Sequence, residues 1–194
     1  MAFLSWSPPV TARVGHSKPA RSLFLMSVLC ASMASAFGQA GPSPEYQVKA
    51  VFLFNLAQFV DWPAEVFPDT RAPLVIGVLG EDPFGAYLDE TVRGETVRNH
   101  RLILQRFRRI SEIKTCHMLF VSHSEAGRLE QIFSAVRGRN ILTVGDADDF
   151  ISRGGMVRLV TERNRIRIRI NMESVRAAGL TISSKLLRLA QPEG

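Results

Sequence analysis

The stretch His117-Met118-Leu119-Phe120-Val121-Ser122 is an apolar run of the length expected for a buried β-strand. Residues 124–136 follow it and predict a helix, with Ser124 as its cap and Gly138 as its stop. Residues 141–144 then form a second short apolar strand. A strand, a helix and a strand in this order predict two parallel strands joined by a crossover helix, which is the repeating unit of an α/β fold.

The same alternation extends in both directions along the chain. The expected helices are residues 45–61, 83–92, 172–178 and 184–190, with shorter helical segments at 110–114 and 147–152. The further expected strands are residues 74–79, 101–107, 156–161 and 165–171, of which the last two form a hairpin. We therefore predict a three-layer α/β sandwich of the Rossmann or flavodoxin-like type. Its sheet is mixed and mainly parallel, with helices on both faces and a late antiparallel hairpin.

The N-terminal region predicts a cleavable secretory signal. Residues 1–22 contain three basic residues and no acidic residue, an apolar run covers residues 23–31, and Ala34-Ser35-Ala36 supplies the small residues of a cleavage site. The apolar run is well short of the ~20 residues that a membrane-spanning helix needs.

This signal predicts the domain organisation and the compartment of the protein. Residues 1–36 are expected to be removed, with cleavage between Ala36 and Ala40, which leaves a linker at 37–44 and a single domain at 45–191. We therefore expect the mature protein to be exported to the periplasm. The formal net charge of +6 falls to +3 when the three basic residues of the signal are removed, so the charge does not argue for a nucleic-acid partner.

Motifs for catalysis, cofactor binding and metal binding are missing from the sequence. No G-x-G-x-x-G or P-loop pattern follows a predicted strand, and there is no nucleophile elbow, no H-E-x-x-H and no pair of cysteines after residue 36. Asp146, Asp148 and Asp149 are interpreted as acids that complement the dipole of a helix N-terminus. We therefore predict no catalytic residue, no metal and no cofactor, and we expect a binding protein.

The first helix carries apolar residues on nearly its whole circumference, interrupted by Lys49, Asn55 and Gln58. A helix at the surface of a domain needs only one apolar stripe. Either this helix is buried on two sides, or one side docks to a second copy of the chain or to a partner protein. Phe52, Asn55 and Phe59 are the partner-binding residues that we select on this helix.

The predicted hairpin carries a stripe of basic residues. A strand places alternate residues on opposite faces, so Arg165, Arg167 and Arg169 share one face of the last strand and the isoleucines between them share the other. A solvated outer face is one explanation, and an acidic protein partner is the functional alternative. No aromatic residues alternate with the arginines, as nucleic-acid binding by base stacking would require.

The segment Tyr46-Gln47-Val48-Lys49-Ala50-Val51-Phe52-Leu53-Phe54-Asn55-Leu56-Ala57-Gln58-Phe59-Val60-Asp61-Trp62-Pro63 resembles the opening helix of YfiR-like periplasmic proteins. The resemblance continues, in order, through residues 116–121, through 141–146 with Phe150 and Gly154-Gly155, and through 167–171 and 178–187. No single piece is specific to the family, but the ordered set of pieces is.

The resemblance implies a periplasmic repressor that binds the periplasmic part of an inner-membrane diguanylate cyclase or sensor protein. Such a repressor restrains synthesis of cyclic di-GMP and so controls biofilm formation. It further implies that an outer-membrane, OmpA-like lipoprotein can sequester the repressor, and that the domain can form a homodimer. The alternative function is a periplasmic small-molecule receptor that acts on a membrane sensor kinase or cyclase. Some family members carry disulfides, whereas Cys116 is the one cysteine here after residue 36, where we expect a buried and inert thiol.

Overall fold

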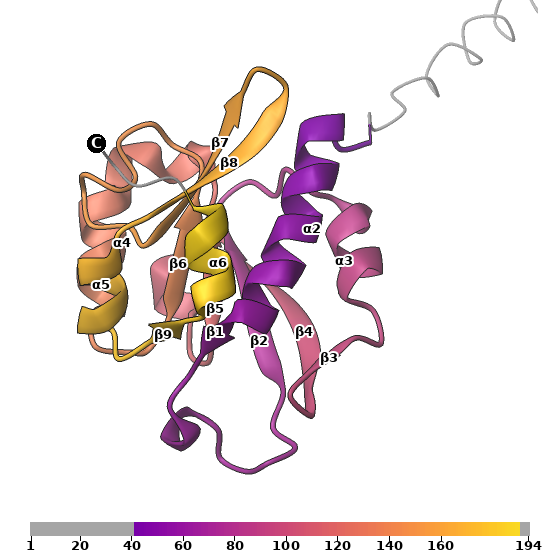
Figure 1. Cartoon of the computed structure of the whole chain (residues 1–194), viewed down its shortest axis with the longest axis vertical. Coiled ribbons are helices and arrows are strands. Elements are labelled where there is room, and N and C mark those ends of the chain that lie inside the picture. The colour runs from indigo at the N-terminus through magenta and orange to yellow at the C-terminus, as the bar shows by residue number, and fades with distance from the viewer. Residues whose placement is uncertain (1–40, 191–194) are drawn as a thin grey trace, which may run out of the picture. The chain divides into compact units, whose positions relative to one another are not determined.

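The computed structural model describes residues 41–190, which form a mixed α/β unit around a seven-stranded sheet (Figure 1). The strands lie in the order β3-β4-β2-β5-β6-β7-β8. Their bounds are β2 Leu74–Leu79, β3 Thr96–Val97, β4 His100–Phe107, β5 Met118–Val121, β6 Leu142–Gly145, β7 Val157–Glu162 and β8 Arg165–Ile170. The five inner strands are parallel, while β3 and β8 are antiparallel to their neighbours at the two edges. The predicted mixed α/β class, the mainly parallel sheet and the late hairpin are confirmed.

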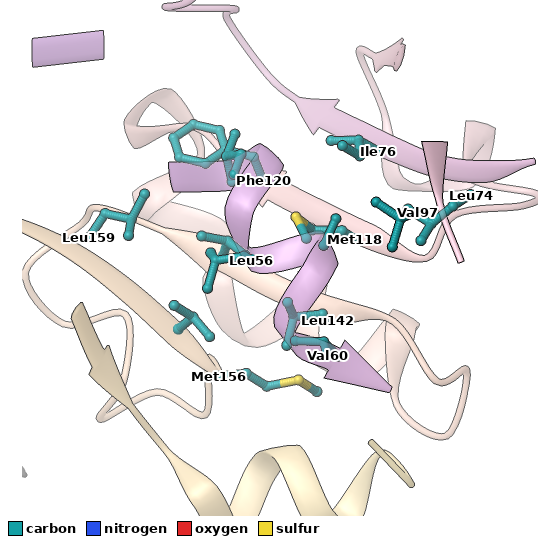
Figure 2. Close-up of a cluster of buried hydrophobic side chains, with 14 of the residues drawn as sticks. Leu56, Val60, Leu74, Ile76, Val97, Met118, Phe120, Leu142, Met156 and Leu159 are labelled. Atoms are coloured by element: carbon teal, nitrogen blue, oxygen red, sulfur yellow. The ribbon is translucent and has the colours of Figure 1, made fainter. Parts of the chain in front are cut away.

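Helices pack on the two faces of the sheet because successive strand residues point to opposite sides. Met118 and Phe120 of β5 belong to a large cluster with buried residues of helix α2 (Pro44–Phe59), much of which Figure 2 shows. Leu119 of β5 belongs instead to a second cluster with Leu129 and Ile132 of helix α4 (Leu129–Val136). Three more helices complete the described part: α3 Ala86–Val92, α5 Met172–Ala177 and α6 Ser184–Leu189.

The connections between the parallel strands differ in whether they contain an α-helix. Numbered in chain order, the five parallel strands lie in the order 2-1-3-4-5, which is the order of flavodoxin-like folds. The connection from β4 to β5 contains only the short 3-10 helix η2 (Ile110–Glu112), and the connection from β6 to β7 is a series of turns. A regular doubly wound fold would place an α-helix in each connection. The flavodoxin-like three-layer sandwich therefore stays a prediction.

The first helix ends earlier than its apolar pattern suggests. Residues Val60–Asp61 leave α2 and form the short strand β1, which pairs antiparallel with β9 (Thr181–Ile182). Helical backbone angles are disfavoured for the residue before a proline, and Trp62-Pro63 therefore favours an extended chain at the end of α2. This small two-stranded sheet ties the end of α2 to the segment between α5 and α6.

Two predicted helices begin later than expected. The segment after β5 starts as a 3-10 helix, η3 (His123–Arg128), and Ser122 caps it by accepting a hydrogen bond from the amide of Ser124. Ser124 is therefore not the cap, and its hydroxyl accepts a hydrogen bond from the amide of Glu81 instead. The helix expected from residue 83 begins at Ala86, because Gly85 adopts a positive φ of 52° that ends the preceding turn.

Among residues 41–190, no helix combines the length and the apolar character that crossing a bilayer requires. The predicted signal at 1–36, its cleavage site and residues 37–40 of the predicted linker at 37–44 lie outside the described residues. The four C-terminal residues lie outside them as well.

Candidate partner-binding surface

One side of α2 faces the core and the other side is open. The buried side is formed by Lys49, Ala50, Leu53, Leu56 and Ala57. On the open side, Val48 is 46% exposed and Val51 40% exposed. The three residues selected from the sequence lie with them at helical spacing: Asn55 is exposed, while Phe52 and Phe59 are partly buried. We call these five residues the α2 patch, and its composition indicates that this side of the helix suits contact with another protein.

A neighbouring helix extends this apolar surface. In Figure 1, α6 lies beside α2, and residues of the two helices are in contact. Two leucines of α6 are exposed, Leu187 at 38% and Leu189 at 66%. Scattered apolar side chains are common on protein surfaces, but several gathered on adjacent helices indicate an interaction site.

The hairpin of β7 and β8 shows the alternation that the sequence predicts. Ile168 is buried in the large core cluster, and Ile166 and Ile170 pack against that cluster. The opposite face carries the basic side chains of β8, which alternate with the isoleucines. Arg158 of β7 lies on the same face, because it is directly opposite Arg169 in the ladder. We call this opposite face, with Arg158, Arg165, Arg167 and Arg169, the arginine face.

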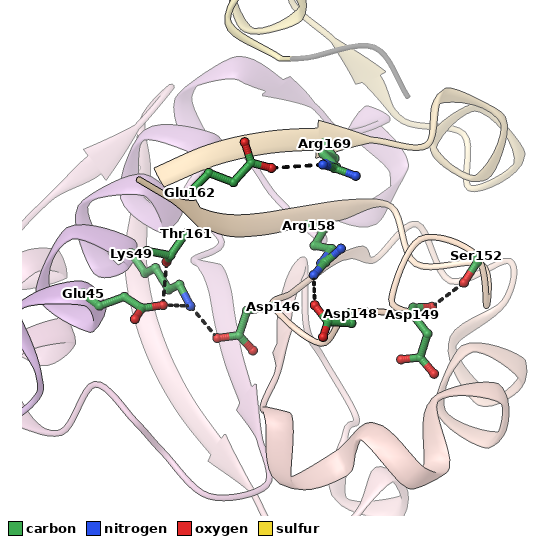
Figure 3. Close-up of polar contacts among 10 residues, drawn as sticks. All are labelled: Glu45, Lys49, Asp146, Asp148, Asp149, Ser152, Arg158, Thr161, Glu162 and Arg169. Atoms are coloured by element: carbon green, nitrogen blue, oxygen red, sulfur yellow. Dashed lines mark hydrogen bonds and ion pairs between the residues drawn. The ribbon is translucent and has the colours of Figure 1, made fainter. Parts of the chain in front are cut away.

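Positive charge on the arginine face is only partly balanced. Glu162 bonds to Arg169 at 3.0 Å, and Asp148 bonds to Arg158, as Figure 3 shows. Within residues 41–190, no carboxylate forms an ion pair with Arg165 or Arg167, and the Nε of Arg167 is buried without a hydrogen-bond partner. The arginine face therefore has spare capacity for carboxylate groups.

A buried ion pair holds the N-terminal end of α2 in place. Lys49 Nζ lies 2.7 Å from Asp146 Oδ2 and 2.6 Å from Glu45 Oε1, and Figure 3 shows these contacts. The Tyr46 hydroxyl donates a hydrogen bond of 2.9 Å to the same Asp146 oxygen, and Thr161 of β7 donates to Glu45. The Lys49 side chain is 3% exposed and that of Asp146 6%. The network thus joins α2, the end of β6 and β7.

The sequence did not predict this network, and Asp146, Asp148 and Asp149 do not have the role predicted for them. Residues 147–152 form turns, and each acid has a basic partner rather than a helix end. Asp148 bonds to Arg158, and Asp149 lies 2.5 Å from Arg153. The interpretation of these acids as dipole partners is therefore wrong. The available signal was a lysine within a strongly apolar helix, because such a lysine needs an acidic partner.

The contacts of the network shift the pKa values of Glu45 and Tyr46. Hydrogen bonds from Lys49 and Thr161 lower the pKa of the Glu45 carboxyl. Burial, and then the nearby negative charge of Asp146, raise the pKa of the Tyr46 hydroxyl. Tyr46 therefore remains a hydrogen-bond donor at neutral pH. Asp146 Oδ1 is buried and has no hydrogen-bond partner in the described part of the chain.

Aromatic rings pack together near Trp62. The Trp62 indole donates a 3.0 Å hydrogen bond to the carbonyl of His117, and Phe67 stacks between His117 and His100, with ring centroids 4.7 and 3.9 Å away. His117 Nδ1 accepts a hydrogen bond from the amide of Val75. Burial, and then the nearby His100, lower the pKa of His117. In this neutral imidazole, Nδ1 carries the lone pair that a general base would use to accept a proton. The amide of Val75 already occupies that lone pair.

Cys116 lies next to His117 and is buried, as expected. Its side chain packs in the second core cluster, and burial raises the pKa of its thiol to about 12. A hollow of about 560 Å³ lies nearby, lined among others by Lys114, Cys116, His117 and Arg139. Over residues 41–190, no group of three or more His, Cys, Asp or Glu side chains is placed to hold a metal ion.

Comparisons with known proteins give a family and partial matches to solved structures. A crystal structure of a conserved domain protein from Vibrio cholerae O1 biovar El Tor matches with a TM-score of 0.50 and 13% identity, covering 79% of this chain and 61% of that chain. The structure of an ABC domain in complex with L-Trp from Streptococcus pneumonia matches with a TM-score of 0.49 and 12% identity, covering 76% and 60%. This chain thus spans about three fifths of the length of both solved chains. The family model described as YfiR/HmsC-like matches residues 46–191, which is more than half of the sequence. The chain therefore belongs to the YfiR/HmsC-like family.

Proposed function

We propose that this protein is a periplasmic regulator that binds and restrains the periplasmic part of an inner-membrane diguanylate cyclase. Membership in the YfiR/HmsC-like family is the observation that carries the proposal. Restraint of the cyclase lowers cyclic di-GMP and so limits biofilm formation. Residues 1–36 act in this proposal as the cleaved export signal.

The surface of the domain supports a role in binding. The α2 patch is apolar, and the arginine face is basic with two arginines free of ion pairs in the described structure. Because the side chains of the arginine face point away from the core cluster that α2 covers, the two surfaces are separate. Two surfaces of different chemistry suit two partners, the cyclase and an outer-membrane OmpA-like lipoprotein that sequesters the regulator. We also propose that the α2 patch serves a homodimer where no partner covers it.

Deletion of the gene in its own host tests the proposed function. The intracellular concentration of cyclic di-GMP is measured in the deletion strain and in strains that carry the gene again. We expect the deletion to raise cyclic di-GMP, and the full chain to restore the wild-type level. A chain without residues 2–36 should accumulate in the cytoplasm and fail to restore it. An unchanged concentration of cyclic di-GMP in the deletion strain would contradict the proposal.

Surface variants then test which residues contact the cyclase. Val51→Glu and Asn55→Glu place charge on the exposed side of α2, and both positions are exposed enough to leave the fold intact. We expect these variants to be stable but to restore cyclic di-GMP poorly. Arg137→Glu is the matched control, because Arg137 is exposed just after α4 and away from both surfaces. Equal restoration by the Asn55 and Arg137 variants would exclude the α2 patch from the cyclase contact.

A further inference from the structure

The strand β8 lies at an open edge of the seven-stranded sheet. β7 is its one strand neighbour in the described part of the chain, and the hairpin is the last pair in the strand order. An edge strand carries a row of backbone N–H and C=O groups that face outward without a partner strand. Such a row is a template on which an extended segment of another chain can pair.

The register of the hairpin identifies which residues of β8 present these groups. The amide of Asn171 donates to the carbonyl of Met156 at 2.8 Å, so the backbone of Asn171 points toward β7. Hydrogen-bonded pairs alternate along an antiparallel ladder, so the backbones of Arg169, Arg167 and Arg165 also point toward β7. The backbone groups between them therefore face the open edge, and they belong to Ile166, Ile168 and Ile170.

We propose that the β8 edge binds an extended segment of a partner protein in which acidic and apolar residues alternate. A segment added to β8 continues the two faces of the sheet, because cross-strand neighbours lie on the same face. Its acidic side chains would lie beside Arg165 and Arg167, which have no ion pair within residues 41–190. Its apolar side chains would lie beside Ile166 and Ile170, which are only partly buried.

The open space beside the arginines fits this occupant. A hollow of about 810 Å³ is lined by Glu162, Arg163, Arg165 and Arg167, so long acidic side chains have room to reach the guanidinium groups. Each guanidinium can bind a carboxylate through two parallel hydrogen bonds.

A second copy of the chain fits the same edge poorly. Two β8 strands paired antiparallel across a two-fold axis perpendicular to the sheet, centred on Ile168, would set Arg167 opposite Arg169. Like charges directly opposite one another destabilise a strand pair. Charge complementarity thus favours an acidic segment over self-association. The inference deepens the proposed function, because it states how a partner would be held.

Binding of defined peptides to the full chain tests the inference without the cyclase. The probe is a synthetic peptide as long as β8 in which Glu and Val alternate, and the control peptide has Lys in place of Glu. We expect the Glu peptide to bind roughly tenfold more tightly, because several opposite-charge pairs add together. Hydrogen exchange resolved by residue should slow at the amides of Ile166, Ile168 and Ile170 when the Glu peptide is added. Equal affinity of the two peptides, or binding without slower exchange at these three amides, would overturn the inference.

Two variants separate edge pairing from simple charge attraction. Ile166→Pro removes an outward N–H while leaving the ladder to β7 intact, so the variant should fold but lose the peptide. Arg165→Glu changes an exposed side chain and should shift the preference toward the Lys peptide. Retention of the Glu peptide by folded Ile166→Pro would also overturn the inference. Sedimentation of the chain alone tests self-pairing, and a dimer that Ile166→Pro dissociates would replace the acidic segment with a second copy. These results do not depend on cyclic di-GMP, so failure here is distinguishable from failure of the proposed function.

Discussion

Lys49 connects α2 to the end of β6 through a buried ion pair. Its ammonium group is buried between Asp146 and Glu45, and Tyr46 donates to the same Asp146 oxygen. Transfer of charged groups from water into a protein interior is costly, and the pair is tolerated because each charge has close partners. Removal of one partner leaves the other charge buried and unpaired.

Lys49→Met should therefore lower the free energy of unfolding by about 3–5 kcal/mol, measured by urea denaturation. The double variant Lys49→Met/Asp146→Leu should recover much of this loss, because no buried charge then lacks a partner. Arg153→Gln is the control: it removes ion pairs with Asp149 and Glu130 in which every side chain is more than a third exposed, and it should cost less than about 1 kcal/mol. A Lys49→Met variant as stable as the Arg153→Gln variant would show that the buried pair does not stabilise α2.

His117 should give the domain a dependence of stability on acid pH. Its folded pKa is lowered from 6.5, first by burial and then by His100, so the unfolded chain binds the proton more readily than the folded one. The contribution of His117 to the free energy of unfolding is fully present above pH 6.5. It is lost as the pH falls from 6.5 toward the lower pKa of the folded state. His117→Asn keeps an acceptor for the amide of Val75 and should flatten this part of the unfolding profile. Exposed His123→Asn is the matched control and should keep the wild-type profile.

Among the elements, the longer strands of the sheet were predictable from the sequence, whereas the two-residue edge strand β3 and the other two-residue strands were not. The runs that became β2 and β5 contain only apolar residues and glycine, and β6 departs from this pattern only at Thr143; such runs identify buried parallel strands without any tertiary information. β1 and β9 are two residues long and pair across a large sequence separation; Trp62-Pro63 marks where α2 ends, but no local pattern marks the pairing itself. The arginine face followed from strand period two, whereas the Lys49 network joins residues 97 positions apart and depends on the fold.

The connection from β6 to β7 contains turns instead of a helix, and the buried ring of Phe150 packs it against the second core cluster. Phe150 is fully buried, and a Cβ added at Gly145 would lie 2.3 Å from its ring. Gly155 meets the same ring and also the carbonyl of Phe150 at 2.6 Å. Gly145 and Gly155 are therefore explained by the space that Phe150 takes.

Gly145→Ala should thus destabilise the domain by about 1–3 kcal/mol, because the new methyl group overpacks the site. Urea denaturation of Gly145→Ala, Phe150→Leu and the double variant forms a thermodynamic cycle. We expect the double variant to lose less than the two single losses combined, since the smaller side chain makes room for the methyl group. Gly127→Ala is the control, because a Cβ there meets nothing within 4 Å. Strict additivity in the cycle would show that the cost at Gly145 has another origin.

On the scale of the whole molecule, α2 is fixed along its length. The Lys49 network holds its N-terminal part, β1 pairs with β9 at its C-terminal end, and Trp62 donates to the carbonyl of His117 just beyond. A surface on an element fixed in this way loses little conformational entropy when a partner binds. The fixed helix therefore supports the choice of the α2 patch as a docking surface, and it makes the patch depend on the integrity of the whole domain.

Cys116 offers a direct measure of that integrity. Its side chain is 7% exposed, and burial raises the pKa of its thiol to about 12, so the reactive thiolate is scarce in the folded protein. In a chain that carries Cys30→Ser, a thiol reagent should therefore label Cys116 only when the domain opens. The extent of labelling should rise with urea along the same curve as the loss of secondary structure. A further variant, Cys30→Ser/Cys116→Ala/Leu189→Cys, places the thiol at a position that is 66% exposed and should react at once without urea. Rapid labelling of Cys116 in the folded protein would instead reveal local opening around β5, and the thiol would then be available for intermolecular disulfides in an oxidising compartment.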